Sequence, residues 1–230
     1  MPLKILSGGA AQGLVNALAP QFKADTGCDI DGAFGAVGAM RDKLVAGAPA
    51  DLLILTASLI AELTRAGHVA PGSAADLGSV LTGVAVRQND ASPPIGDAAS
   101  LRDALRAAGG IYFPDPKLAT AGIHFAKVLG ALGIADELGP KLQVFPNGAA
   151  AMTALAASTE SRPIGCTQIT EILNTPGVTL LGPLPKEFEL ATVYTAGVGA
   201  AAALPDQARR FVALLTSDGA RPLRERAGFR

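Results

Sequence analysis

The sequence contains no tryptophan, and only 4% of its residues are aromatic. So few aromatic side chains argue against a surface on which nucleic-acid bases stack. The formal net charge at pH 7 is −1, so no overall positive field attracts nucleic acid or an anionic membrane. Apolar residues make up 49% of the chain and charged residues 17%, a balance that excludes a disordered protein. We therefore predict a folded chain without a nucleic-acid partner.

Cysteine and histidine are scarce, with two of each. Cys28 and Cys166 lie far apart, and neither belongs to a Cys-x-x-Cys pair or has a histidine at metal-ligand spacing. We interpret both as small buried residues, and nothing in the sequence indicates a disulfide. No spacing supports a Ser–His–Asp arrangement. The sequence therefore predicts neither a metal site nor a cofactor.

Long apolar runs are also missing, so we expect no membrane insertion. The first residues, Met1–Leu6, run directly into Ser7-Gly8-Gly9 without the basic segment, apolar stretch and cleavage site of a secretory signal. The protein is then cytoplasmic, or periplasmic if a signal peptide was removed. We favour the cytoplasm, because Met-Pro-Leu is typical of a natural start.

Strand and helix patterns alternate along the whole chain. Leu14, Leu18 and Phe22 recur at i, i+4 and i+8, as on the buried side of a helix, whereas residues 51–55 form a buried-strand run. Repeated βα units predict a mostly parallel sheet flanked by helices on both faces. The pattern begins a second time after residue 87, so we predict two lobes with a ligand cleft between them: residues 1–82 with 195–230, and residues 83–194.

Loops that follow the strands are the candidate site, because ligands of open α/β sheets bind outside the carboxyl ends of the strands. Residues 7–12, 35–39 and 115–124 are rich in small side chains and lead into helices. Glycine lets the backbone approach a ligand, and free N–H groups at a helix start favour an anion. Dinucleotide and phosphate-loop glycine motifs are absent. These loops together predict a site for a small anion, held by backbone and hydroxyl donors.

The predicted ligand-binding residues lie in these three loops and in two later ones. They are Ser7, Gly8, Gly9, Ala10, Gln12, Val37, Gly38, Thr120, Ala121, Gly122, Asn147, Thr167 and Gln168. His124 lies in the first turn of the helix beside them, and an imidazole can exchange a proton near neutral pH. We predict His124 as the catalytic residue, the alternative being a surface or packing histidine.

Several segments resemble the molybdate-binding components of bacterial importers, which have the two-lobed type II periplasmic-binding-protein fold. They are Lys4–Phe22, Phe34–Met40, Ala46–Leu52, Asp115-Pro116 with Ala121-Gly122, and Ala227–Phe229. The resemblance covers nearly the whole chain and implies this fold. Molybdate binders of the family have serines after the first two strands and usually a late tyrosine, where this sequence has Ala10, Ala36 or Val37, and Gln168. The missing hydroxyls favour a carboxylate over molybdate.

A second resemblance is closer in detail and points to a subgroup that includes bacterial aconitate isomerases. It rests on Ser7-Gly8-Gly9, Gly165–Leu173, Pro176–Val178 and Gly182–Pro185. These enzymes shift an allylic double bond in a carboxylic acid, which implies a base, an acid and N–H groups that stabilise the developing charge. We predict an isomerase of this type. The alternatives are the substrate-binding component of a molybdate or tungstate ABC importer, without chemistry, and a ligand sensor.

Overall fold

The computed structural model describes residues 1–230, which divide into two α/β units. Unit 1 comprises Met1–Val80 and Thr192–Arg230, and unit 2 comprises Leu81–Ala191. Two long strands, β4 (Ala75–Arg87) and β9 (Ala191–Val198), contribute residues to both units. None of the helices combines the length and the apolar character of a membrane span.

The sheet of unit 1 has the strand order β2 (Ile30–Gly35), β1 (Leu3–Gly8), β3 (Leu52–Thr56) and β9. Strand β1 is parallel to both β2 and β3, and β9 is antiparallel to β3. The carboxyl ends of the three parallel strands therefore lie at one edge of the sheet, where the predicted small-residue loops begin.

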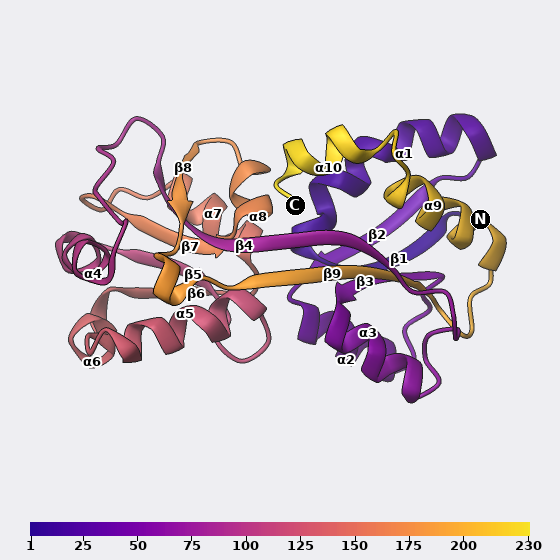
Figure 1. The fold of residues 1–230 in the computed structure, drawn as a ribbon, viewed down its shortest axis with the longest axis horizontal. Coiled ribbons are helices and arrows are strands. Elements are labelled where there is room, and N and C mark those ends of the chain that lie inside the picture. Colours follow the sequence, from indigo (N-terminus) through magenta and orange to yellow (C-terminus); the bar gives the residue numbers. More distant parts are fainter. The chain divides into compact units, whose positions relative to one another are not determined.

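Helices cover both faces of this sheet (Figure 1). One face carries α1 (Gln12–Thr26), α9 (Pro205–Thr216) and α10 (Arg221–Ala227), and the other carries α2 (Val37–Val45) and α3 (Ala57–Arg65). The rings of Phe22 and Phe211 pack with their centroids 4.9 Å apart. Helices from the beginning and the end of the chain thus share one core.

Asp51 joins the two segments of unit 1. Its side chain is 3% exposed and accepts hydrogen bonds from the N–H groups of Lys4, at 2.8 Å, and Leu204, at 2.9 Å. A buried carboxylate is stable where such donors replace water. Asp51 therefore holds the segment before α9 against the first strand.

Unit 2 has the strand order β4, β7 (Ile164–Gln168), β5 (Ile111–Pro114) and β6 (Leu142–Phe145). Strand β5 is parallel to β6 and β7, whereas β4 is antiparallel to β7. On its other side, β4 pairs with β8 (Val178–Pro183). The three parallel strands again direct their carboxyl ends to one edge.

Alternating residues of these strands enter two separate apolar clusters. Val84 and Val86 face one cluster, and Ala85 faces the other. The first cluster is covered by α4 (Ala98–Ala107), α5 (Thr120–Ala131) and α6 (Ala135–Leu138), the second by α7 (Gly148–Ala156) and α8 (Ile169–Leu173). The predicted α/β class, with a helix-covered sheet in each lobe, is confirmed. Short 3-10 turns complete the chain: η1 (Gly9–Ala11), η2 (Gly139–Lys141) and η3 (Lys186–Phe188).

Candidate functional site

In unit 1, the structure brings together the loops after β1 and β2. A Cβ built on Gly8 would lie 2.8 Å from Val37 Cγ1 and 3.1 Å from Tyr194 Cε1. Ser7 is fully buried, and its hydroxyl donates to the carbonyl of Gly8 at 2.9 Å. Gly9 and Ala10 form the turn η1, and Gln12 begins α1. Tyr194, on β9, is a neighbour of Gly8. The sequence analysis missed it, because its strand comes late in the chain.

The first turn of α2 has unpaired backbone donors. Ala36 precedes the helix and supplies no side-chain cap. The first hydrogen bond within the helix runs from Met40 N–H to Ala36 C=O at 3.0 Å, so the N–H groups of Val37 and Gly38 have no partner inside it. Both residues are buried. Such groups form a site for negative charge.

In unit 2, the first turn of α5 has the same arrangement. Ala119 supplies no side-chain cap, and the first helical bond runs from Ile123 N–H to Ala119 C=O at 2.9 Å. The N–H groups of Thr120, Ala121 and Gly122 therefore lack helical partners. Thr120 is partly buried and Ala121 and Gly122 are buried, and a Cβ built on Gly122 would lie 2.2 Å from the carbonyl oxygen of Pro114.

His124 lies one turn further along α5, on the same side of the helix as Thr120. Its side chain is partly buried, and Nε2 lies 2.7 Å from the carbonyl oxygen of Phe188. A carbonyl only accepts hydrogen bonds, so Nε2 is the donor and carries the proton. Nδ1 is consequently the ring atom that can accept one.

The first turn of α7 differs, because protein side chains already bind it. Asn147 Oδ1 accepts a hydrogen bond from Ala150 N–H at 2.9 Å. The N–H groups of Gly148 and Ala149 donate to the carboxylate of Glu171, which also accepts from Thr167 Oγ1 at 2.5 Å. Asn147 and Thr167 are two predicted ligand-binding residues, and their side-chain oxygens are thus bound within the protein.

Glu171 is the buried ionisable group of this region, and the sequence analysis did not select it. Burial raises the pKa of its carboxyl group, while the hydrogen bonds from Thr167 and from the N–H groups of Gln168, Ala149 and Gly148 lower it. A Cβ built on Gly148 would lie 1.9 Å from Glu171 Oε2. Only glycine lets the helix start approach the carboxylate this closely. The Thr-x-x-x-Glu spacing was visible in the sequence, but its burial was not.

Gln168, at the carboxyl end of β7, has an unpartnered side chain. The residue is 2% exposed, and neither its Nε2 nor its Oε1 has a hydrogen-bond partner. Thr82 lies directly opposite on β4 and is fully buried, and its Oγ1 also lacks a partner. The hydroxyl of Thr170, 3% exposed, is unpartnered as well. Opposing residues of two strands share one side of the sheet, so the Gln168 amide and the Thr82 hydroxyl are adjacent.

The ionisable residues form no cluster that suits a metal ion. Cys28, in unit 1, and Cys166, in unit 2, are both buried and unpaired. Burial raises the pKa of the Cys166 thiol, which keeps it in the protonated, unreactive form.

Comparison with known proteins gives concordant matches. The family model of the "Bacterial extracellular solute-binding protein" matches residues 3–230. The "Aconitate isomerase" of Pseudomonas sp is 26% identical over 234 residues, covering 99% of this chain and 87% of that protein. The "Molybdate-binding protein ModA" of Escherichia coli (strain K12) is 28% identical over 199 residues, covering 82% and 75%. The solved periplasmic molybdate-binding protein of Azotobacter vinelandii has a TM-score of 0.81 at 20% identity, covering 99% and 98%.

Proposed function

Because this chain belongs to the bacterial extracellular solute-binding protein family, we propose that it binds a small carboxylate and shifts a double bond within it, as an aconitate isomerase does. The chain has the two-lobed type II fold of periplasmic solute-binding proteins. The names of its relatives refer to aconitate and to molybdate, and both are anions. The proposal therefore concerns which anion is bound and whether it reacts.

The hydrogen-bond donors in the first turns of α2 and α5 favour a planar carboxylate over a tetrahedral oxyanion. In unit 1, Ala10 and Val37 have no hydroxyl, and that of Ser7 is bound to a carbonyl. Of the residues predicted there, the donors that remain are backbone N–H groups at the helix starts, which bind carboxylates. A tetrahedral anion requires donors in more directions.

The observation that carries the proposal is the unpartnered amide of Gln168. A buried polar group without a partner costs about 1–3 kcal/mol, and a bound ligand removes that cost. The amide N–H₂ can donate to a carboxylate, while its oxygen can accept from a ligand hydroxyl or a protonated carboxyl group. Thr82, directly opposite, adds a hydroxyl. An organic acid with several polar groups satisfies this combination.

For the chemical step, we assign the base to Nδ1 of His124. It removes a proton from the carbon beside a carboxylate, the double bond moves by one position, and the imidazolium returns a proton at the far allylic carbon. No atom is gained or lost. N–H groups at the start of α5 stabilise the negative charge of the intermediate. Glu171 is a poorer candidate, because hydrogen bonds from the protein already bind its carboxylate.

A thermal-shift panel followed by proton NMR in D₂O tests this function. We expect cis- or trans-aconitate to raise the melting temperature, since ligand at a hundredfold excess over Kd stabilises by about 2.7 kcal/mol. The bound acid should then gain deuterium or a moved double bond. A shift with molybdate alone would contradict the proposal.

His124→Gln refines the test, because a Gln amide can still donate to the Phe188 carbonyl but cannot act as a base. We expect it to keep the thermal shift and lose turnover. Lys127→Gln, an exposed change on the same helix, should keep both. Full turnover by the His124→Gln protein would exclude histidine from the mechanism.

The likeness to molybdate-binding proteins favours a second candidate, the binding component of an importer without chemistry. Binding of an anion without deuterium exchange would support it. We place the protein in the periplasm for either function, in line with its periplasmic structural relative. The cytoplasmic location predicted from the sequence has no support in these comparisons.

A further inference from the structure

Unit 2 contains a cavity of about 460 Å³ that takes no part in the proposed function. Its walls include Val86, at the end of β4, and Ile164, the first residue of β7, which pair across the sheet. The four steps along β7 from Ile164 to Gln168 span about 13 Å at a rise of about 3.3 Å per residue. The cavity therefore lies at the opposite end of the sheet from Gln168.

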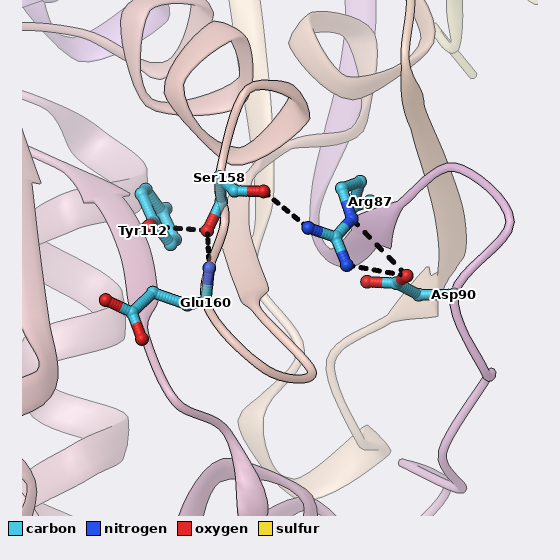
Figure 2. Close-up of polar contacts among 5 residues, drawn as sticks. All are labelled: Arg87, Asp90, Tyr112, Ser158 and Glu160. Carbon is cyan, nitrogen blue, oxygen red and sulfur yellow. Dashed lines mark hydrogen bonds and ion pairs between the residues drawn. The ribbon is translucent and has the colours of Figure 1, made fainter.

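Arg87 lines this cavity, and Figure 2 shows the polar contacts of its side chain. Its Nε and Nη2 donate to Asp90 Oδ1 at 3.3 and 2.9 Å, and its Nη1 donates to the carbonyl of Ser158. Ser158 Oγ in turn accepts from Tyr112 Oη at 2.8 Å and from Glu160 N–H at 3.1 Å. The guanidinium is thus held from both sides.

Asp90 provides an unused acceptor in the same wall. Its Oδ1 binds Arg87, but its Oδ2 is buried and has no hydrogen-bond partner. A buried carboxylate oxygen without a donor is unfavourable. A ligand that presents an O–H or N–H group would satisfy it.

Arg162 provides an unpaired positive charge at the rim. It lines the cavity, is exposed, and takes part in no ion pair or hydrogen bond. Its backbone has φ of 51°, and Asn89, next to Asp90, has φ of 71°. Arginine is strained in this left-handed region, whereas asparagine adopts it readily. Strain of this kind concentrates at ligand sites, so the loop of Arg162 is the constrained one.

Apart from Ser92 and Ser161, the remaining lining residues are apolar. Ala104 and Ala107 of α4, together with Val86 and Ile164, leave room for a short aliphatic group. The charges of Arg87 and Asp90 cancel, so Arg162 gives the residues that line the cavity one net positive charge. These features define a ligand with an anionic group, an adjacent hydrogen-bond donor and a short apolar body.

We propose that this cavity is a second ligand site, which takes a small monocarboxylate with a hydroxyl or ammonium group on the carbon beside the carboxylate. The carboxylate faces Arg162, the adjacent donor binds Asp90 Oδ2, and the aliphatic group lies on Ala104 and Ala107. This site is independent of the isomerase proposal, because it shares no residue with it.

Titration calorimetry on the full chain tests the site with three probes: 2-hydroxy-3-methylbutanoate, valine and 3-methylbutanoate. At least one of the first two should bind about tenfold or more tightly than the third, which lacks the donor for Asp90. Equal binding of all three, or no binding at millimolar concentration, would overturn the proposal.

Variants then locate the bound probe. Arg162→Asn keeps a residue that tolerates the left-handed backbone, and Asp90→Asn replaces the free acceptor by a donor. Each should weaken binding about tenfold to hundredfold, whereas Arg226→Asn, an exposed arginine of unit 1, should not. Gln168→Leu should also leave it unchanged. Binding that is lost in Gln168→Leu and kept in Arg162→Asn would place the probe in the first site and refute the second.

Discussion

Thr167 donates a hydrogen bond of 2.5 Å to Glu171, across the junction between β7 and α8. The same carboxylate binds the first N–H groups of α7. The carboxylate of Glu171 thus lies where an external anion binds at the start of other helices. The acceptor that these N–H groups require is already part of the chain.

The raised pKa of Glu171 predicts a dependence of stability on pH. Burial raises this pKa in the folded state above its ordinary value of 4.5, so the contribution of Glu171 to stability is complete below about pH 4.5 and is lost as the pH rises through the folded-state pKa. Glu171→Gln has no such titration. We compare the unfolding free energies of the wild type and of Glu171→Gln. Their difference, wild type minus variant, should fall as the pH rises, by at most about 1.4 kcal/mol per pH unit. Urea denaturation from pH 4 to 8 measures it, and a constant difference would contradict this prediction.

Gly148→Ala should destabilise the protein by about 1–3 kcal/mol, because the new Cβ would overlap Glu171 Oε2. Gly130→Ala is the matched control. Gly130 lies in α5, and a methyl group added to it would meet no atom within 4 Å, so alanine should stabilise that helix by about 0.5–1 kcal/mol. Chemical denaturation of both variants measures the difference. Equal changes in the two proteins would show that α7 has room beside Glu171.

Gln168→Leu should separate ligand binding from folding. Leucine replaces the amide by an apolar group of similar size, so the free protein should be as stable as the wild type or more stable. Affinity for the carboxylate should fall about tenfold or more. Gln143→Leu, an exposed position on β6, should leave affinity unchanged. Calorimetric titration with aconitate compares them, and unchanged affinity in Gln168→Leu would remove the amide from the site.

Asp51→Ala should destabilise the protein by about 2–4 kcal/mol, because the N–H groups of Lys4 and Leu204 would lose their buried acceptor. Asp218→Ala, an exposed aspartate, should change stability by less than about 0.5 kcal/mol. Thermal unfolding of the two variants measures the contrast. A small effect at Asp51 would mean that water replaces its hydrogen bonds.

The fold was largely predictable, because the alternation of strands and helices is a local property of the sequence. Leu14, Leu18 and Phe22 are buried on one side of α1, as their spacing indicates. That α2 and α5 begin without a side-chain cap was predictable too, since alanines precede Val37 and Thr120.

The partners of the site residues were less accessible to sequence reasoning. Asn147 and Thr167 have the polar atoms of ligand-binding residues, but the first turn of α7 binds the former and Glu171 binds the latter. His124 likewise acquires a partner in Phe188, far away in the sequence. Each of these contacts depends on how distant segments pack, which no local pattern encodes.

The division of unit 1 into two segments has a consequence for synthesis. Unit 2 is one continuous stretch, Leu81–Ala191, so all of its strands have left the ribosome before β9 is complete. Unit 1 must wait for α9, which supplies Phe211 to its core. During that interval, Phe22 lacks its contact with Phe211, and Asp51 lacks the hydrogen bond from Leu204 N–H. Chaperones that act on this protein during translation should therefore bind its first 80 residues.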